Sequence, residues 1–591
     1  MQGCEPEDCR GPVDKLSPRH RTRYTRSMAF NFLSMLPPWM TYIEGEAPIV
    51  LVAPHGGRRP ADAPIRDSIK VNDLYTAELT ALLAARTQSY ALINHALDRN
   101  DLDLNRVSQV CARAPWFLAA LVELLSALVE RHGVARVFFI HGWNIAQPVC
   151  DLGMGLKQRG NRVVPAGKAA PTLSAAFFTA AVLPFRTAAL AQGIDVALGR
   201  RYPAADKNNV MQVFSARFAN DHSPLIRTLA ALSTQGKVEA VQLELGVGLR
   251  WPGPERERFV EVFCQTLGRC APSAQGESRD FSTLSLPYSS PVRALHLEGS
   301  PLALPYTPEP TRLGLHFHDP ASGLGVMGGI EFNRSASTYS GRLLLSLGGS
   351  ELILFTGEDD ATADPRNVRV GGFVWQRHED GLTISYRGTV MRVFHPQAFI
   401  RLEEGLAASW IEPAEVTLHL TLPQSPSPPP LPLFLTQLRG EVRLRDRRCA
   451  LDAWGFLDML KSEETGRLLP RRLLSLPFGP DLGIFLSWVE TLDGPRSCGI
   501  LYHHGTPHPL RAEDWELRYT LERGRPTAFH LSLTPPTPLT LHCSGETLTA
   551  IPVVRHASQG SALAVTFGLS RTVWQGREAR GVYEFSERMK R

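Results

Sequence analysis

Apolar and polar positions follow two patterns along the chain, and the pattern changes near residue 275. Before that point, short runs of β-branched and aliphatic residues alternate with longer segments of helical periodicity. The runs that predict buried strands are 47–53, 90–94, 135–140 and 238–243, and the segments that predict helices are 73–85, 116–130, 225–232 and 255–267. Strands that alternate with helices predict an α/β domain with a mostly parallel sheet.

From about residue 280 onward, short alternating runs stand between Gly, Pro, Asp and Asn residues. This pattern favours antiparallel β domains, built as barrels or sandwiches. A proline-rich tract at 423–432 predicts a stiff linker between two of them. We therefore expect a multidomain chain with an α/β part and an all-β part. The expected segments are an N-terminal extension over 1–45, an α/β domain over 46–275, a first β domain over 280–422 and a second over 433–591.

The composition is that of a globular protein. Of the 591 residues, 43% are hydrophobic and 20% are charged, which excludes a wholly disordered, collagen-like or coiled-coil chain. The formal net charge of +5 is too small to indicate a nucleic-acid partner or an anionic membrane. No apolar run is long enough for a membrane span, and the first thirty residues lack the apolar stretch of a secretory signal. Nine cysteines without a C-x-x-C pair indicate reduced thiols, so we expect a cytoplasmic protein.

Polar residues stand at the ends of three predicted strands of the α/β domain. His55 follows the strand 47–53, His141 follows 135–140, and Glu244 follows 238–243. Ligands of open α/β sheets bind at the carboxyl ends of the strands. Two histidines and a carboxylate are the ligand set of a catalytic zinc, whose bound water has a pKa of about 7, and a further carboxylate can take that water's proton. The alternative is that each histidine is a hydrogen-bonded structural residue beside a strand-to-helix turn.

Several short motifs along the α/β segment help to decide between a zinc site and structural histidines. They are Pro54-His55-x-Gly57, the segment Asp73-Leu74-Tyr75, Arg99-x-x-x-Asp103-Leu104-Asn105-Arg106, His141 and Gln242-Leu243-Glu244. In these motifs, residues 47–270 resemble the N-formylglutamate amidohydrolase family, which is similar in fold and zinc chemistry to zinc carboxypeptidases and acylases. The resemblance implies hydrolysis of an N-acyl or peptide-like amide next to a free carboxylate of a small-molecule substrate.

The resemblance also implies roles for individual residues. His55, Asp73 and His141 would bind Zn²⁺, and Glu244 would be general base and then general acid. Arg106, helped by Asn105, would hold the substrate carboxylate, and Arg99 is a second candidate for substrate contact. Asp73 also stands where it can cap the predicted helix, and the nearby Asp67 is the alternative ligand. One departure concerns the acyl pocket: the family usually carries Ser or Thr after the second histidine, and this chain has Gly142.

The β part contains a different group of motifs. Trp454-Gly455-Phe456-Leu457-Asp458, the glycine-rich run 323–329 and the terminal run 581–585 resemble the paired lipocalin-like domains of the carotenoid hydratase and tocopherol cyclase group. In that group such a strand lies near a cavity for a hydrophobic ligand, which implies a second site at Trp454, Asp458 and Glu584. Met459 stands where the group has a histidine. The alternative is that the aromatic residues belong to a β core and that the carboxylates are solvated.

Two functions are compatible with these patterns. The first is a zinc-dependent amidohydrolase whose β domains bind a bulky, apolar substrate. The second is a lipocalin-like hydratase, cyclase, isomerase or hydrophobic-ligand binding protein with an accessory or inactive α/β domain. Whether His55, Asp73, His141 and Glu244 converge in the folded chain discriminates between the two.

Overall fold

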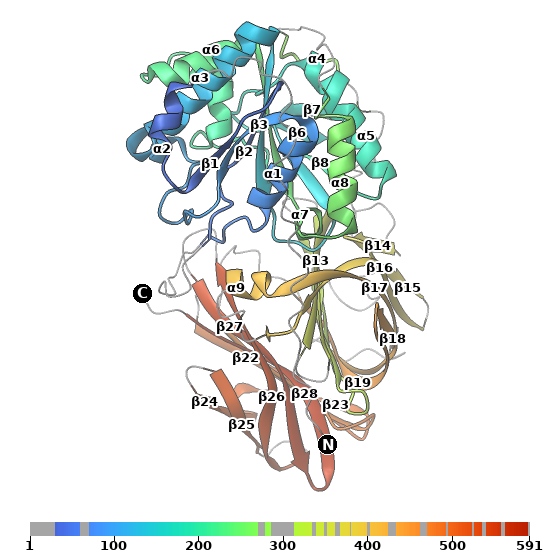
Figure 1. The fold of residues 1–591 in the computed structure, drawn as a ribbon. Helices are drawn as coiled ribbons and strands as arrows, with labels where there is room; N and C mark the ends of the chain where they lie inside the picture. The colour runs from blue at the N-terminus through green and yellow to red at the C-terminus, as the bar shows by residue number, and fades with distance from the viewer. Residues whose placement is uncertain are drawn as a thin grey trace, which may run out of the picture.

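The chain folds into an α/β domain followed by two antiparallel β sheets, as the patterns predict (Figure 1). The computed structural model describes residues 30–58, 70–269, 278–284, 286 and, apart from short intervening segments, 312–588. Among these residues, no single helix is long and apolar enough to cross a membrane, and only the pair Val107–Arg113 and Pro115–His132, bent by 100°, reaches that length together.

The α/β domain is built on a seven-stranded sheet of order β1-β3-β2-β4-β9-β5-β8. Its strands are β1 (Met40–Ile43), β2 (Ala47–Ala53), β3 (Ser89–Asn94), β4 (Ala135–Gly142), β5 (Val149–Gly153), β8 (Asp195–Leu198) and β9 (Val238–Leu245). The central pairs β3–β2, β2–β4 and β4–β9 are parallel, and β1 and β5 join antiparallel. The expected mostly parallel sheet is confirmed.

Helices cover both faces of this sheet because its strands are apolar on both sides. Leu51 of β2 packs on the face covered by α1 (Thr76–Thr87), α5 (Leu183–Ala191) and α8 (Pro254–Gln265), and Val50 packs on the face covered by α3 (Pro115–His132) and α6 (Pro224–Thr234). The remaining elements of the domain are η1 (Asn31–Met35), α2 (Val107–Arg113), β6 (Leu156–Arg159), β7 (Arg162–Pro165), α4 (Ala175–Phe177), η2 (Phe178–Val182), η3 (Val210–Phe214), η4 (Ala216–Phe218) and α7 (Val247–Arg250).

The α/β domain begins earlier than residue 46. Strand β1 pairs with β3, and Phe32 is fully buried in the core against β2 and α3 residues. The end of the expected extension over 1–45 is therefore part of the domain, and residues 1–29 lie outside the described residues. The sequence pattern missed β1 because four residues behind a Pro-Pro pair are too short to show a period.

The first β sheet closes on itself. Strands β10–β13 and β16–β19 form an antiparallel barrel that is closed by the pairing of β13 with β16, and the hairpin β14–β15 extends the edge. The strands are β10 (Arg312–His318), β11 (Leu324–Asn333), β12 (Thr338–Leu347), β13 (Glu351–Asp360), β14 (Asn367–Val370), β15 (Phe373–Arg377), β16 (Gly381–Val393), β17 (Ser409–Thr421), β18 (Leu433–Leu444) and β19 (Arg448–Leu460), with helix α9 (Leu402–Ala407) before β17.

The boundary between the β domains differs from the expected one. Strand β18, which follows the tract 423–432, pairs with β17, which precedes it, and β19 pairs with β10. Residues 433–460 therefore complete the first barrel and are not the start of the second domain; the tract itself lies outside the described residues. A proline-rich segment can connect two strands of one sheet because the entropy of closing a loop grows only slowly with its length.

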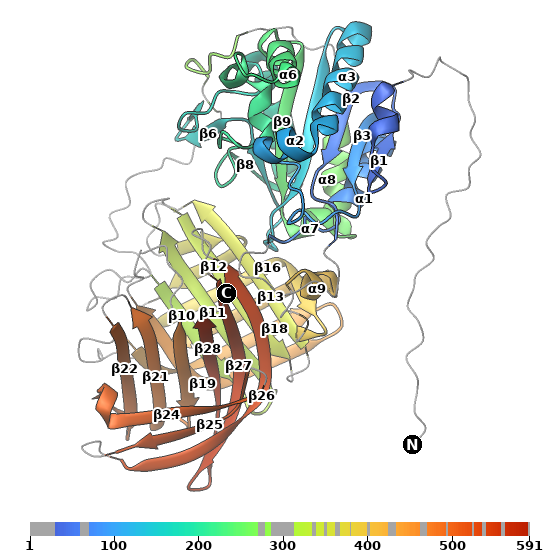
Figure 2. The same ribbon diagram turned by 90° about the vertical axis from the view of Figure 1, so that its left-hand side faces the viewer.

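The second sheet is open and has the order β23-β22-β21-β20-β28-β27-β26-β25-β24. Its elements are β20 (Arg471–Pro477), β21 (Leu482–Thr491), β22 (Gly494–His503), β23 (Thr506–Leu510), η6 (Ala512–Asp514), β24 (Trp515–Glu522), β25 (Arg525–Leu533), β26 (Leu541–His556), β27 (Ala562–Trp574) and β28 (Arg577–Arg588). Figure 2 shows this sheet curving beside the barrel, where β28 lies against β10.

The three parts meet in one buried junction. A single apolar cluster joins Trp251 of the α/β domain, Leu344 of the barrel and Phe567 of the second sheet. Polar contacts reinforce the junction: the Gln147 side chain accepts a hydrogen bond from the Glu358 backbone at 3.1 Å. Helix α7 directly follows β9 and lies beside the barrel in Figure 1, so the carboxyl ends of the central strands face the β domains.

Candidate metal centre and neighbouring groups

Three of the predicted ligands converge at the carboxyl end of the parallel sheet. The Nδ1 atoms of His55 and His141 each lie 3.1 Å from Oδ2 of Asp73, and all three side chains are buried. One ligand atom from each residue lies within 4.8 Å of the others. The parallel pairing of β2 with β4 accounts for this, because His55 follows the end of β2 and His141 lies near the end of β4.

Asp73 is a neighbour of the histidines and does not cap a helix. Helix α1 begins at Thr76, and Tyr75 precedes it with a φ of 65°. This left-handed residue separates Asp73 from the helix, and the Asp73 backbone N–H donates to the His55 carbonyl at 2.8 Å. The N-cap interpretation is therefore wrong for Asp73. The alternative ligand, Asp67, lies outside the described residues.

Burial sets the charge of His141. It lowers the pKa of His141 to about 4, and the hydrogen bond to Asp73 only partly opposes this effect. Burial acts in the opposite direction on Asp73, but Arg99 and His55 outweigh it and hold the pKa of Asp73 well below its usual range. At neutral pH the group thus presents a neutral imidazole beside a carboxylate, which are the protonation states that a metal ligand needs.

Asp103 is a further neighbour of His55 that sequence reasoning did not assign. Its Oδ1 lies 2.7 Å from Nε2 of His55, and its Oδ2 accepts a hydrogen bond from Lys70 at 2.8 Å. Burial would raise the pKa of Asp103, but His55, Arg99 and Lys70 hold it well below its usual range. An ionised carboxylate only accepts, so Nε2 of His55 donates to Asp103, and Nδ1 is the ring nitrogen that faces Asp73. The signal was present in the sequence, because Asp103 belongs to the Asp103-Leu104-Asn105-Arg106 motif.

Glu244 stands beside this group. Strand register places it next to His141 on β4 and next to Asp151 on β5, and its Oε1 accepts a hydrogen bond from Gln242 at 2.8 Å. Burial raises the pKa of Glu244 well above its usual value, and the negative charge of Asp73 adds to this effect. A carboxyl group with a raised pKa next to His141 is suited to accept and return a proton.

The two predicted arginines occupy different places. The Arg99 guanidinium donates to Oδ1 of Asp73 at 3.2 Å and lies 3.6 Å from Oδ2 of Asp103, so it neutralises the carboxylates around His55. The side chain of Arg106 is 34% exposed and lies 3.7 Å from Asp103. The buried Oδ1 atom of Asn105 has no hydrogen-bond partner among the described residues. The Arg106 guanidinium also lies 3.6 Å from Asp206. The contact of Arg106 and Asn105 with a substrate stays a prediction.

Gly142 is explained by a buried arginine. A Cβ atom at Gly142 would lie within van der Waals overlap of the Arg250 guanidinium, which is fully buried. This guanidinium donates to the carbonyls of Leu74 at 2.7 Å and Leu245 at 3.0 Å and to Asn144 at 3.0 Å. Arg250 therefore binds the chain segment that follows His141. Its guanidinium occupies the space that a Ser or Thr side chain at position 142 would need.

Two of the three candidates in the β part lie near a shared cavity. Asp458 is fully buried, and its Oδ2 lies 2.8 Å from Nε2 of His316. Strand β10 therefore supplies a histidine to Asp458 from the neighbouring strand, although position 459 is Met. Glu584 lines a cavity together with His316, whereas Trp454 packs against the apolar cluster around Phe456.

Comparison with known proteins finds similar solved structures for both parts. The N-formylglutamate amidohydrolase from Ralstonia eutropha JMP134 is 15% identical over 38% of this chain and 96% of its own, with a TM-score of 0.25. A protein assigned as AttH from Nitrosomonas europaea is 14% identical over 46% of this chain and 90% of its own, with a TM-score of 0.32. Kievitone hydratase from Nectria haematococca is 8% identical over 46% of this chain and 87% of its own, with a TM-score of 0.28.

No protein-family model and no curated protein matches the chain. The similar structures include an amidohydrolase and a hydratase, both at low similarity.

Proposed function

We propose that the α/β domain is a zinc-dependent amidohydrolase that cleaves an N-acyl or peptide-like amide next to a free carboxylate. The observation that carries this proposal is the convergence of His55, Asp73 and His141 in one buried group with Glu244 beside it. Two imidazole nitrogens and one carboxylate oxygen form the ligand set of catalytic zinc sites, which leave one position open. The residues present therefore fit this metal.

Zinc, when bound, supplies a positive charge that polarises the amide carbonyl and lowers the pKa of a water molecule. Asp103 accepts from Nε2 of His55 and so orients the ring with Nδ1 toward Asp73 and His141. Glu244 accepts a proton from the attacking water and returns it to the leaving nitrogen. The planar guanidinium of Arg106 binds the substrate carboxylate and orients the amide, with Asn105 as a second contact.

Metal analysis of the purified chain tests the proposal. We expect about one zinc per chain in the parent, none in the His55→Ala/His141→Ala variant, and full zinc content in a control with the exposed His222→Ala substitution. The zinc-loaded parent should then hydrolyse at least one member of a panel of N-formyl, N-acetyl and longer N-acyl amino acids. Equal metal content in parent and double variant would contradict the proposal.

A second candidate function rests on the β part. The buried pair of His316 and Asp458 beside a cavity favours a lipocalin-like hydratase, cyclase, isomerase or binding protein. If the parent binds no zinc when supplied with it, this function replaces the first one. Both can also operate in one chain, since the two groups share no residue.

A further inference from the structure

The segment that carries Asp73 belongs to no helix or strand. Residues 71–75 precede α1 in irregular conformation. His141 lies within β4 and His55 follows the end of β2, so hydrogen bonds of the sheet fix the backbone at both histidines. The position of an irregular segment depends instead on the side chains that bind it. Asp73 is therefore the ligand whose place requires support from neighbouring groups.

Asn72, the residue before Asp73, provides part of this support. Its side chain is fully buried, and its Oδ1 accepts a hydrogen bond from the Arg99 backbone at 2.9 Å. Its Nδ2 donates to Asp98 at 3.1 Å and to Oε2 of Glu403 at 3.1 Å, which uses both hydrogens of the amide. The backbone N–H of Asn72 donates to the same Oε2 at 3.3 Å. One carboxylate oxygen of Glu403 thus binds both the side chain and the backbone of Asn72.

Glu403 belongs to the barrel and not to the α/β domain. It lies on α9, which Figure 2 shows at the end of the barrel that faces the α/β domain. Asn72 and Glu403 are 331 positions apart in the sequence. The hydrogen bonds between them therefore join two domains at a residue directly next to a predicted metal ligand.

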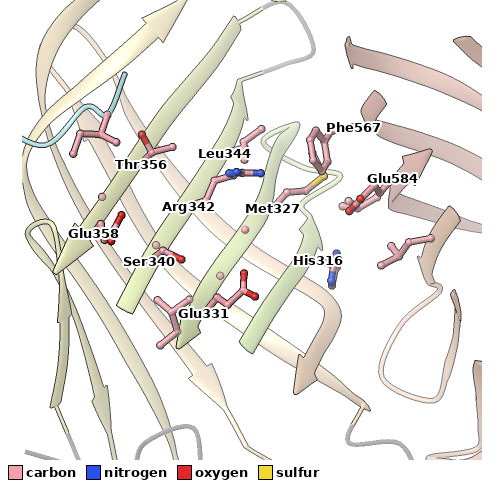
Figure 3. Close-up of a pocket in the computed structure, with 18 of the residues that line it drawn as sticks. His316, Met327, Glu331, Ser340, Arg342, Leu344, Thr356, Glu358, Phe567 and Glu584 are labelled. Atoms are coloured by element: carbon pink, nitrogen blue, oxygen red, sulfur yellow. The ribbon is translucent and has the colours of Figure 1, made fainter. Parts of the chain in front are cut away.

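The residue after Asp73 is also held by the β part. Leu74 is buried and belongs to one apolar cluster with Leu406 of α9. The same cluster contains Met327 of the barrel and Phe567 of the second sheet, which point toward one another in Figure 3. Both sequence neighbours of Asp73 are thus bound by residues outside the α/β domain.

Other hydrogen bonds also join the barrel to the α/β domain, but they lie away from this segment. The hydroxyl of Thr389 on β16 donates to Glu255 on α8, and both residues are buried. Neither residue belongs to the segment 71–75. Comparison of Thr389 with Glu403 therefore separates general attachment of the domains from a specific effect on Asp73.

We propose that Glu403 is a positioning residue of the metal centre, which binds Asn72 and thereby sets where Asp73 lies relative to His55 and His141. This role rests on the proposed function, because it concerns the same zinc site. The α/β domain supplies the ligands, and the barrel holds one of them in place.

Zinc affinity, measured on the full chain by competition with a chelating dye, tests this role. We expect the affinity of Glu403→Ala to be about tenfold below that of the parent, because groups that orient a ligand affect metal binding by this order. Glu403→Gln retains an oxygen that can accept from both N–H groups, so its affinity should stay within about threefold of the parent's. Thr389→Val removes the other hydrogen bond between the domains and should leave the affinity unchanged.

Hydrogen–deuterium exchange of the metal-free chain provides a second measurement. Residues 71–75 should exchange faster in Glu403→Ala than in the parent and in Thr389→Val, whereas β2 and β4 should exchange equally in all three. Unchanged exchange at 71–75 would overturn the role of Glu403.

The zinc measurement also distinguishes this role from the proposed function. About one zinc per parent chain with equal affinity in Glu403→Ala would overturn the role of Glu403 and leave the proposed function intact. An equal loss of affinity in Thr389→Val would assign the effect to attachment of the domains and would also overturn it. Absence of zinc from the parent would contradict the proposed function itself, and the role of Glu403 with it.

Discussion

The chain contains two buried groups of histidine and carboxylate, and they are built in different ways. His55, Asp73 and His141 meet at the carboxyl end of a parallel sheet, where segments that follow separate strands reach one point. His316 and Asp458 meet across two neighbouring antiparallel strands, on the outer face of the barrel where His316 contacts Phe485 of the second sheet.

This difference indicates what each group can bind. The end of a parallel sheet collects several donor atoms around one position, so it can surround a cation. An antiparallel strand pair brings together only facing and diagonal side chains of the two strands, and His316 and Asp458 are such a diagonal pair. The carboxylate then orients one ring nitrogen toward a neighbouring space. The first group is therefore suited to a metal ion, and the second to an organic ligand.

The sharpest test of the first group is Glu244→Gln. Glutamine keeps the shape and the contact with Gln242 but cannot accept a proton, so kcat for the amide substrate should fall about 10²- to 10⁴-fold. Zinc content, measured by mass spectrometry, should be unchanged, as it should be in the control Glu257→Gln on the exposed side of α8. Retained turnover in Glu244→Gln would remove Glu244 from the mechanism.

Asp103 distinguishes a metal centre from a group of mutually hydrogen-bonded side chains. Asp103→Asn removes the charge that orients His55, and we expect zinc affinity to fall about 10- to 100-fold in competition with a chelating dye. The exposed Asp101→Asn serves as the control. Unchanged zinc affinity would show that the contact with Asp103 does not affect His55 as a zinc ligand.

The junction between the two regions should respond to pH. Burial raises the pKa of Asp359 to about 6, although the Gly371 N–H and Arg200 oppose this effect. The folded chain then binds more protons than the unfolded chain between about pH 4 and 6, so this contribution to stability is complete below pH 4 and is lost as the pH rises through 6. Its size is about 3 kcal/mol.

Thermal unfolding of the parent and of Asp359→Asn from pH 4 to 8 checks this expectation. Asparagine does not titrate, so the Tm of the variant should rise relative to that of the parent as the pH increases through 6. A difference in Tm that stays constant across this range would show that Asp359 titrates normally.

The smallest expected effect concerns Arg106, the residue proposed to bind the substrate carboxylate in the α/β domain. Arg106→Lys keeps the charge but loses the two-pronged grip on a carboxylate, so KM should rise about three- to tenfold with little change in kcat. Steady-state kinetics on the best substrate of the panel measure both constants. An unchanged KM would place the substrate carboxylate elsewhere, with Arg99 as the next residue to examine.

Much of the α/β domain could be predicted because its signals are local. The run 47–53 is β2 to the residue, and the helix expected over 116–130 lies within α3. The positions of His55, His141 and Glu244 after buried strands were sufficient to predict a common site. Local patterns did not show β1, and they did not show that residues 433–460 belong to the first barrel, because strand pairing across a long connection leaves no periodic signal.

The amino-acid pattern determined the fold classes, the strand ends and the identity of the residues that can bind a metal, because periodicity and residue type are properties of short segments. Only the tertiary structure decided that Asp73 faces two histidines, that Asp103 orients His55 and that Arg250 fills the space beside Gly142. It also supplied His316 to Asp458 from another strand. These contacts join residues far apart in the chain, and their distances are set by sheet register and packing, which no short segment encodes.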